Sequence, residues 1–225
     1  MVLLAVPELR CNLKTVTRRS RQVYCRPGAN VIVTMTSMPE KWVLDHLYPA
    51  ADAQLGYFTT SQAEELGVDR RYLTHHLRSG NLERVERGIY RLRHYPSHRF
   101  EDVMTAVLWV GEGSVASHAT ALAIYGLADA MPPVIHITAE RRFRGHRTGV
   151  IVHTASLPDE DVTNREGIPV TTPLRTLADV ASDRSVAEAA ASEALERGLV
   201  RETQLRDLVT RLPQLAGAFS PLLNP

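Results

Sequence analysis

The chain has 225 residues, of which 44% are hydrophobic and 23% are charged, and its formal net charge is +1 at pH 7. This composition is typical of a globular protein with one substantial domain and a second, small one, and it excludes a disordered tail protein. No run of about 18 apolar residues is present, which argues against a membrane span.

The two cysteines, Cys11 and Cys25, have no histidine nearby and no second pair of cysteines. Their spacing therefore predicts neither a zinc site nor a disulfide framework. The apolar start of the chain is interrupted by Pro7, Glu8 and Arg10, unlike a secretory signal. We expect a cytoplasmic protein without metal, cofactor or membrane contact.

Residues 1–37 form a leader without sustained apolar periodicity, and four of its arginines cluster between Arg18 and Arg26. Two explanations are open. The leader is either a flexible basic arm that adds phosphate contacts, or the result of a start codon assigned too early, with Met35 and Met38 as later starts. The second explanation is favoured, because the first convincing helix begins only after Met38.

The first predicted helix opens at Pro39–Trp42 and buries a stripe of apolar side chains: Val43, Leu44, Leu47 and Ala51. We expect Trp42 and Tyr57 to be core residues. A second helix follows Thr59 or Thr60, either of which can cap it, and it ends at Gly67.

A third helix is predicted from Arg70 to Ser79, with Asp69 as its cap and Leu73 and Leu77 on its buried face. After the break at Gly80, the alternation from Leu82 to Leu92 predicts a two-stranded hairpin with its turn at or near Arg87-Gly88. Helix, turn, helix and basic hairpin in this order predict a winged helix-turn-helix.

Positive charge is concentrated in this region. From Arg70 to Arg99 there are eight arginines and two acids, a local balance of +6 in a chain of net charge +1. Such a stripe is expected of a surface that neutralises DNA phosphates. The predicted DNA-binding residues are Arg70, Arg71, Thr74 and His75 for base contacts, and Arg78, Arg84 and Arg87 for phosphates or the minor groove.

After Pro96 the pattern changes to alternating helices and strands. Helices are predicted around Phe100–Leu108, His118–Tyr125 with Ser117 as cap, from Thr172-Pro173, and at about 185–197 and 202–211. Two β-type runs, 134–139 and 150–155, are predicted to pair as a hairpin across the segment between them.

The predicted fold is therefore α+β: an N-terminal winged helix-turn-helix domain at 38–96, followed by a mixed α/β C-terminal domain at 97–225 with a small sheet. The junction at Tyr95-Pro96-Ser97 is expected to be exposed. A short hairpin at 134–155 would present four arginines at one tip, Arg141, Arg142, Arg144 and Arg147, where they could contact an anion or a partner. This loop is a solvated tip, an extension of the DNA footprint, or a docking surface for a toxin or RNA.

No catalytic residue is predicted. Ser117 and His118 are adjacent, and adjacent residues on a helix do not face each other. His94 and His98 are separated by Pro96, which forbids the regular helix that would aim both at one metal. A group of four acids, Asp159, Glu160, Asp161 and Glu166, lies in a loop that begins with proline and is interpreted as solvated.

Four phrases of the sequence, found in this order between about 57 and 182, resemble the AbiEi family of antitoxins and transcriptional repressors from bacterial type IV toxin–antitoxin systems. They are FTTSQAEELGVDRRYLTHHLRSGNLERVERGIYRL, SHATALAIYGL, VIHITAERRFRGHRTGVIVHTASL and GIPVTTPLRTLADVA. The first alone indicates only a winged helix-turn-helix, whereas the four together are far more specific.

The resemblance implies a repressor that binds inverted repeats upstream of its own operon through its N-terminal domain. It also implies a C-terminal domain that counteracts a nucleotidyltransferase-like toxin, and the double-stranded operator could be bound by a dimer. Two alternatives remain open: a metal-dependent nuclease targeted by the winged domain, or a protein-interaction module that does not bind DNA.

Overall fold

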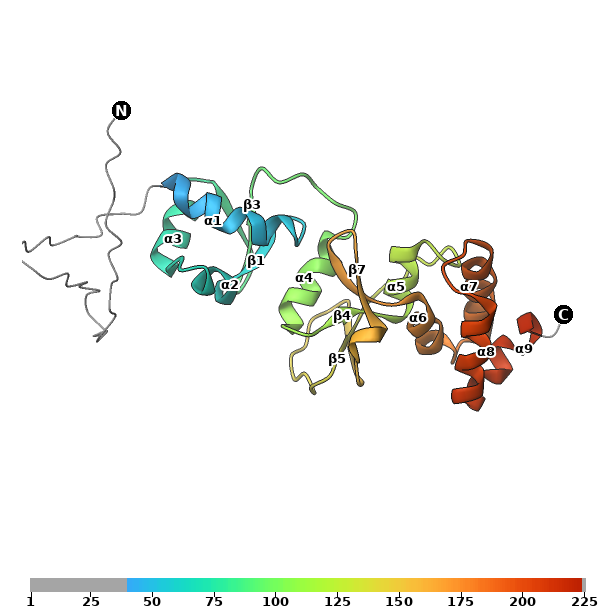
Figure 1. The fold of residues 1–225 in the computed structure, drawn as a ribbon. Helices are drawn as coiled ribbons and strands as arrows, with labels where there is room; N and C mark the ends of the chain where they lie inside the picture. Colours follow the sequence, from blue (N-terminus) through green and yellow to red (C-terminus); the bar gives the residue numbers. More distant parts are fainter. Residues whose placement is uncertain (1–39, 224–225) are drawn as a thin grey trace, which may run out of the picture.

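The computed structural model describes residues 40–223; the predicted leader at 1–37 and the side chain of Trp42 lie outside the described part of the chain. The fold is α+β, as predicted, with an N-terminal winged helix-turn-helix followed by a mixed α/β part. In Figure 1 the winged part lies at one end, a second sheet lies in the middle and the last helices lie at the other end.

The winged part consists of three helices and a small sheet in the order α1 (Glu40–Asp52), β1 (Tyr57–Thr59), α2 (Thr60–Glu65), α3 (Arg70–Arg78), β2 (Leu82–Glu86) and β3 (Ile89–Leu92). The sheet is antiparallel with strand order β1-β3-β2. The wing hairpin and both helices of the helix-turn-helix are confirmed. The sequence analysis missed β1, because alternation over three residues is too short to recognise.

A compact apolar cluster fills the space between α1, α2, α3 and the sheet. Val43, Leu47 and Ala51 are fully buried, which confirms the predicted stripe of α1. Leu73 of α3 and Phe58 of β1 complete the cluster from the other side. This packing fixes α3 with its opposite face outward.

The C-terminal part begins with α4 (Glu101–Val110) and contains a five-stranded sheet of order β6-β5-β4-β8-β7. Its strands are β4 (Val115–Ala116), β5 (Ile135–Ala139), β6 (Val150–Thr154), β7 (Val162–Arg165) and β8 (Ile168–Thr171). Its remaining helices are α5 (His118–Tyr125), α6 (Pro173–Val180), α7 (Arg184–Glu196), α8 (Glu202–Arg211) and α9 (Ala216–Leu223), with short 3₁₀ turns at Asp159–Asp161 and Pro213–Leu215. The helices predicted here are confirmed, whereas β4, β7, β8 and α9 were not predicted.

The predicted hairpin between the runs at 134–139 and 150–155 is wrong. Both runs are strands, but β5 and β6 pair in parallel, with Ile135 opposite Val150 and Ala139 opposite Thr154. The chain must therefore return from the end of β5 to the opposite end of the sheet before β6 begins. Alternation of apolar residues specifies the face of each strand and not its direction, so it fits either pairing. The long connection was a signal against a hairpin, whose loops usually have about 2–5 residues.

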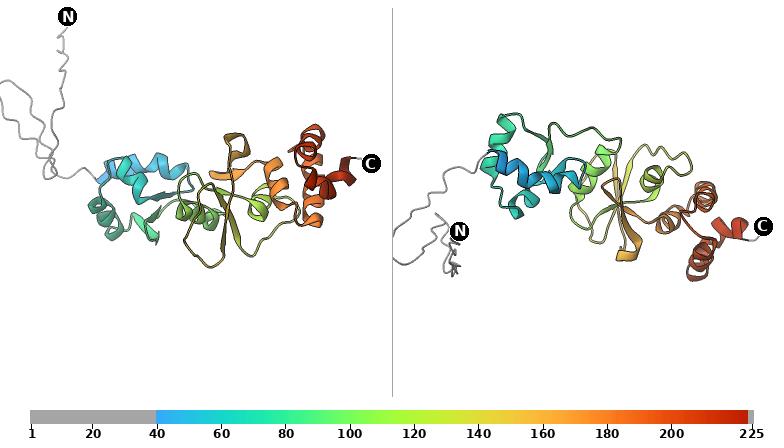
Figure 2. Two further views of the ribbon diagram at one scale, coloured as in Figure 1. Left: turned by 90° about the horizontal axis from the view of Figure 1, so that it is seen from below. Right: turned by 45° about the horizontal axis from the view of Figure 1, so that its top comes forward.

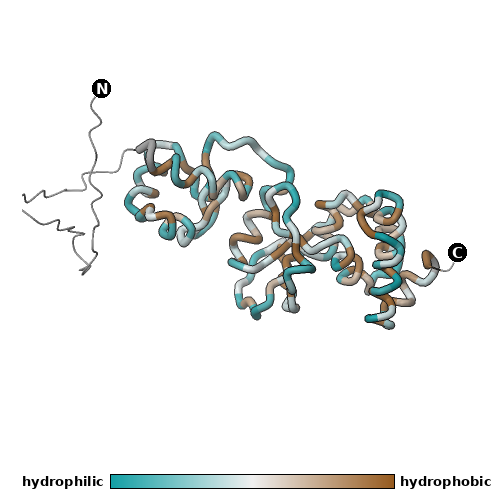
Figure 3. The backbone as a smooth tube through the Cα atoms, viewed as in Figure 1, coloured by the Kyte–Doolittle hydropathy of each residue, from teal (hydrophilic) through white to brown (hydrophobic). Residues whose placement is uncertain are grey.

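The two parts of the chain share an apolar core. Leu55, Tyr57 and Ile89 of the winged part belong to the same buried cluster as residues of α4, α5 and the five-stranded sheet. Arg91 of β3 also donates a hydrogen bond of 3.1 Å to Glu101 of α4. The connecting segment is hydrophilic, as the teal colour in Figure 3 shows, and Pro96 and Ser97 within it are exposed, as predicted.

Candidate nucleic-acid interface

Local capping positions the two helices of the helix-turn-helix. The Thr59 hydroxyl accepts a hydrogen bond from the backbone N–H of Gln62, whose side chain accepts one from the backbone N–H of Thr59. At the start of α3, Asp69 accepts a hydrogen bond of 2.8 Å from the backbone N–H of Arg71, and this bond lowers the pKa of Asp69. The carboxylate therefore stays charged at the positive end of the helix, where it stabilises the first turn.

The outward face of α3 carries the residues that the sequence analysis selected. Every one of them is exposed: Arg70, Arg71, Thr74, His75 and Arg78. The opposite face is held by Leu73, which is 1% exposed, and by the partly buried Leu77. The structure thus brings these five polar side chains together on one accessible face.

Two of these arginines pair with acids close by in the sequence. Arg70 lies 2.9 Å from Glu64 of α2, and Arg71 lies 3.1 Å from Asp69. Both arginines are largely exposed in these pairs, so the pairs contribute little to stability and can be exchanged for a phosphate or a base at small cost. The Thr74 hydroxyl donates to the carbonyl oxygen of Arg70 at 2.9 Å, which leaves its oxygen able to accept.

The wing carries two further predicted residues, and its turn lies beside the start of α2, where the backbone N–H of Thr60 donates a hydrogen bond of 2.9 Å to the carbonyl oxygen of Gly88. A bulge between Arg84 and Glu86 interrupts the ladder of β2 and β3, and the turn lies at Arg87-Gly88, as predicted. Arg84 and Arg87 are both exposed, and neither has an ion pair with any residue in the described range. Their guanidinium groups are therefore available to an anionic partner.

The basic surface contains fewer unpaired arginines than the charge count along the sequence suggested. Arg91, Arg93 and Arg99 are neutralised by acids that lie apart from them in the sequence: Arg91 by Glu101 at 3.1 Å, Arg93 by Glu83 at 3.5 Å and Arg99 by Glu166 at 3.0 Å. The side chain of Arg91 is only 12% exposed. Counting charges along the chain could not detect these pairs, because the tertiary structure brings Glu101 and Glu166 to them.

The four arginines predicted at a hairpin tip do not share one. Since β5 and β6 are parallel, Arg141 follows the end of one strand while Arg147 lies near the start of the next, at the other end of the sheet. Arg141, Arg142 and Arg144 are exposed. Arg147 lies 2.8 Å from Glu86 of the wing and is only 24% exposed.

A polar cluster between the five-stranded sheet and helices α5 and α6 escaped the sequence analysis. Its core is a stack of three imidazoles: the rings of His118 and His153 lie 3.8 Å apart, and Nδ1 of His136 lies 3.0 Å from Nε2 of His153. Burial lowers the pKa of all three and that of His118 to about 4. All three imidazoles are therefore neutral near pH 7.

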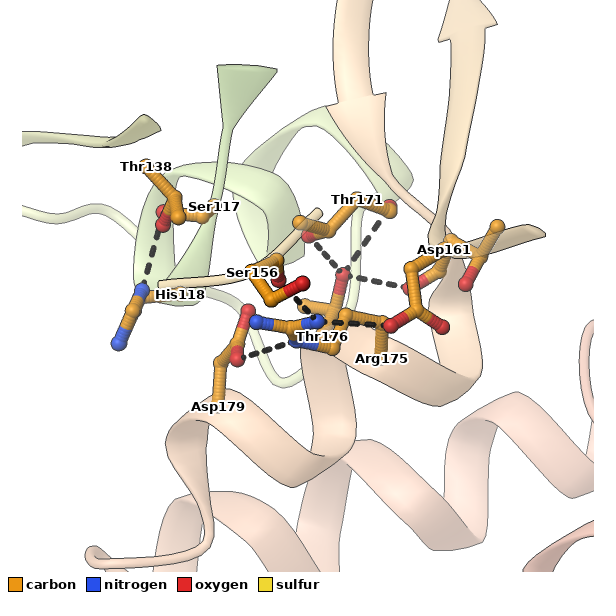
Figure 4. A network of polar contacts seen from close by, with 10 residues as sticks. Ser117, His118, Thr138, Ser156, Asp161, Thr171, Arg175, Thr176 and Asp179 are labelled. Atoms are coloured by element: carbon orange, nitrogen blue, oxygen red, sulfur yellow. Dashed lines mark hydrogen bonds and ion pairs between the residues drawn. The ribbon is translucent and has the colours of Figure 1, made fainter. Parts of the chain in front are cut away.

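Ser117 and His118 do face each other, contrary to the expectation that adjacent residues cannot. His118 has a left-handed φ of 51°, and its Nδ1 lies 3.0 Å from the Ser117 hydroxyl (Figure 4). That hydroxyl also accepts a hydrogen bond of 2.7 Å from Thr138 and is fully buried. Ser117 occupies the cap position of α5, but its side chain makes no capping bond, so this detail of the prediction is wrong.

Arg175 of α6 is the charged centre of the same region. Figure 4 shows it between Asp161 and Asp179, which lie 2.7 and 2.8 Å from its nitrogens. Burial raises the pKa of Asp179, although the guanidinium opposes this shift. Arg175 and Asp179 lie four residues apart on a helix, a spacing that brings two side chains together. This spacing was the one sequence signal that could have identified the pair.

The predicted acidic patch is divided among separate partners. Asp161 pairs with Arg175, whereas Glu166 pairs with Arg99 and with His98 at 3.2 Å. Within residues 40–223, no group of three or more histidine, cysteine, aspartate or glutamate side chains is arranged to hold a metal ion. None of the helices in this range has the length and apolar character needed to cross a membrane.

Two models of one protein family match the chain. Residues 47–93 match a family model described as "Transcriptional regulator, AbiEi antitoxin", and residues 114–219 match one described as "AbiEi antitoxin C-terminal domain". No curated protein matches the chain significantly in sequence. Among solved structures, the RV2827C protein from Mycobacterium tuberculosis is similar at 17% identity and a TM-score of 0.47, over 84% of this chain and 78% of that one.

Proposed function

Because this chain belongs to the AbiEi antitoxin family, a family of antitoxins and transcriptional regulators, we propose that it represses its own operon by binding operator DNA. The winged part, assigned to 38–96, would bind inverted repeats upstream of the operon, with one copy of the chain on each half-site. The remainder, 97–225, would counteract a nucleotidyltransferase-like toxin encoded by a neighbouring gene.

The observation that supports DNA binding is the exposed polar face of α3 beside the wing. A recognition helix enters the major groove with its N-terminal residues near the bases, and in α3 these are Arg70 and Arg71. An arginine can donate two parallel hydrogen bonds to a guanine, and Thr74 and His75 lie one turn further along the same face. Arg78 in the last turn of α3, and Arg84 and Arg87 on the wing, would hold phosphates.

The test is a binding titration of the full chain with fluorescently labelled DNA from upstream of its operon, against a scrambled duplex of equal length. We expect preferential binding that weakens steeply with salt, since several phosphates are neutralised. Absence of binding at low salt would refute the proposal and favour a protein-interaction module. Cutting of the duplex that depends on magnesium or manganese would favour the nuclease alternative.

Antitoxin action is tested separately, by expressing the chain with the neighbouring gene in cells whose growth that gene arrests. A variant with Arg70, Arg71 and Arg78 changed to glutamine should lose repression and keep its fold, because all three side chains are exposed. Rescue of growth from a foreign promoter by this variant would assign neutralisation to a function other than repression. Failure to rescue would assign it to repression alone.

A further inference from the structure

The five-stranded sheet ends in an outer strand, β6, that has a neighbour on one side only. In both views of Figure 2 this sheet lies between the winged part and the last helices. Its strand order is β6-β5-β4-β8-β7, and among the described strands β6 pairs with β5 alone. The other side of β6 therefore presents backbone groups that the sheet does not pair.

The ladder between β5 and β6 shows which residues present these groups. At its start, the backbone N–H of Ile135 donates a hydrogen bond of 2.7 Å to the carbonyl oxygen of Gly149. At its end, the N–H of Ala155 donates one of 3.2 Å to the carbonyl oxygen of Ala139. Since the direction of the backbone groups alternates along a strand, the odd-numbered residues of β6 face β5. The even-numbered residues, Val150, Val152 and Thr154, face away from it.

Two of these three residues have free backbone groups. The N–H of Val150 donates to the carbonyl oxygen of Arg147 at 3.2 Å. Val152 and Thr154 make no backbone hydrogen bond on this side with any residue from 40 to 223. The open side of β6 can therefore both donate to and accept from an added strand.

β6 also lacks the features that usually prevent an outer strand from pairing with another chain, which are charged side chains, prolines and bulges. Its sequence is VIVHT, and its pairing with β5 runs without a register shift. Burial lowers the pKa of His153, so this imidazole is neutral near pH 7. Ile151, in the same strand, is 43% exposed.

The outer strand at the other end of the sheet is different. β7 has the sequence VTNR, in which Thr163 and Asn164 are exposed polar residues and Arg165 carries a charge. The side chain of Asn164 accepts a hydrogen bond of 3.0 Å from the backbone N–H of Gly167. Of the two outer strands, β6 is therefore the one whose sequence favours pairing.

A second copy of β6 fits this edge in register. Two copies of one strand can pair antiparallel about a two-fold axis through Val152. This brings Val152 opposite its own copy, Val150 opposite Thr154 and Ile151 opposite His153. Even-numbered residues then face even-numbered residues, so the free backbone groups of the two copies meet. An uncharged strand does not repel its own copy, whereas an acidic or basic strand of another protein would find no opposite charge there.

We infer that β6 is a dimerisation strand, through which two copies of the chain join their sheets into one continuous sheet. The pairing is isologous and therefore closes at two copies. The contact is small, so the dimer should dissociate on dilution. The inference concerns the free protein and does not depend on the proposed DNA binding, to which it would add the two copies that inverted repeats require.

The first test is sedimentation velocity of the full chain over a series of concentrations, which should show a monomer that converts to a dimer. Ile151→Lys changes an exposed side chain and removes two cross-strand pairs from each dimer. Because such pairs contribute up to about 1 kcal/mol each, the dissociation constant should rise by about tenfold. The matched control, Thr163→Lys, adds the same charge to β7 and should leave the dissociation constant unchanged.

The second test examines the register and does not rely on the lysine variant. In a chain that carries Cys11→Ser and Cys25→Ser, Val152→Cys would place two thiols on opposed residues whose Cα atoms are about 5.5 Å apart. This separation allows a disulfide, so mild oxidation should give a covalent dimer. Thr163→Cys in the same background, on β7, should stay monomeric after the same treatment.

The outcomes separate this inference from the proposed function. A wild-type chain that is monomeric at every concentration overturns the inference and leaves the proposed DNA binding unaffected. A dimer that Ile151→Lys does not weaken and that Val152→Cys does not cross-link has its contact elsewhere, which also overturns it. Dimerisation as expected without any DNA binding would refute the proposed function alone.

Discussion

At the scale of single residues, the outward face of α3 combines two kinds of proposed DNA contact. Replacing Arg71 or Thr74 by alanine should reduce the preference for the operator by roughly 1–3 kcal/mol, because a base contact is lost. Replacing Arg78 should weaken binding to all sequences alike, because a phosphate contact carries no sequence information. Competition titrations with operator and mutated duplexes measure both effects. A larger change of preference for the Arg78 variant would contradict the assignment.

A second effect at the residue scale concerns His118 and pH. Burial, with smaller contributions from the neighbouring His153, His136 and Arg175, lowers its pKa from 6.5 to about 4 in the folded protein. The unfolded chain therefore takes up a proton at a higher pH than the folded one. The contribution of the neutral His118 side chain to the free energy of unfolding is therefore fully present above about pH 6.5, and it is lost as the pH falls toward about 4. We expect acidification to lower the free energy of unfolding across this window.

The variant His118→Asn tests this effect, since asparagine tolerates the left-handed φ of 51° at this position. Between pH 7 and pH 5 the free energy of unfolding should fall in both proteins, and the fall should be about 1 kcal/mol smaller in the variant than in the wild-type chain. Urea unfolding at each pH measures this difference. Comparing the two proteins at each pH isolates the imidazole from Asp179, whose raised pKa acts in the opposite direction. Parallel curves for the two proteins would show that His118 does not titrate in this window.

At the scale of elements, a glycine that ends one helix and a glycine inside another should respond to alanine in opposite directions. Gly126 ends α5 in the left-handed conformation with φ of 66°, and a Cβ there would meet no atom closer than 3.9 Å. Gly126→Ala should therefore cost about 1 kcal/mol through its backbone conformation alone. Gly217 lies within α9 with open space around it, so Gly217→Ala should stabilise by up to about 1 kcal/mol. Thermal unfolding of both variants measures the two signs.

At the scale of the whole molecule, the shared core of Leu55, Tyr57 and Ile89 with the C-terminal part predicts cooperative unfolding. The chain has two tryptophans, Trp42 on α1 and Trp109 on α4. In the variant Trp42→Phe, the fluorescence of Trp109 follows the C-terminal part, whereas circular dichroism follows the helices of both parts. We expect the midpoints of the two signals in urea to coincide, because separating the parts would expose buried apolar surface. Two distinct midpoints would instead favour independent domains with boundaries near 96.

Local patterns of the sequence were sufficient for the winged helix-turn-helix and for most helices. The caps at Thr59 and Asp69 and the break at Gly126 depend on bonds between residues a few positions apart, which the sequence displays directly. The exposed face of α3 follows from its helical period for the same reason. The sequence alone was therefore sufficient to predict which residues share the outward face of α3.

Other features were decided only by contacts between distant segments. The parallel direction of β6 leaves the same alternating pattern as a hairpin would, so the pattern could not reveal it. The removal of Arg91 and Arg99 from the basic surface depends on Glu101 and Glu166. Likewise, the stack of His118, His136 and His153 exists because one helix start and two strands meet. Such pairings connect residues far apart in the chain, and neither charge counts nor periodicity carry information about which distant side chains will be neighbours.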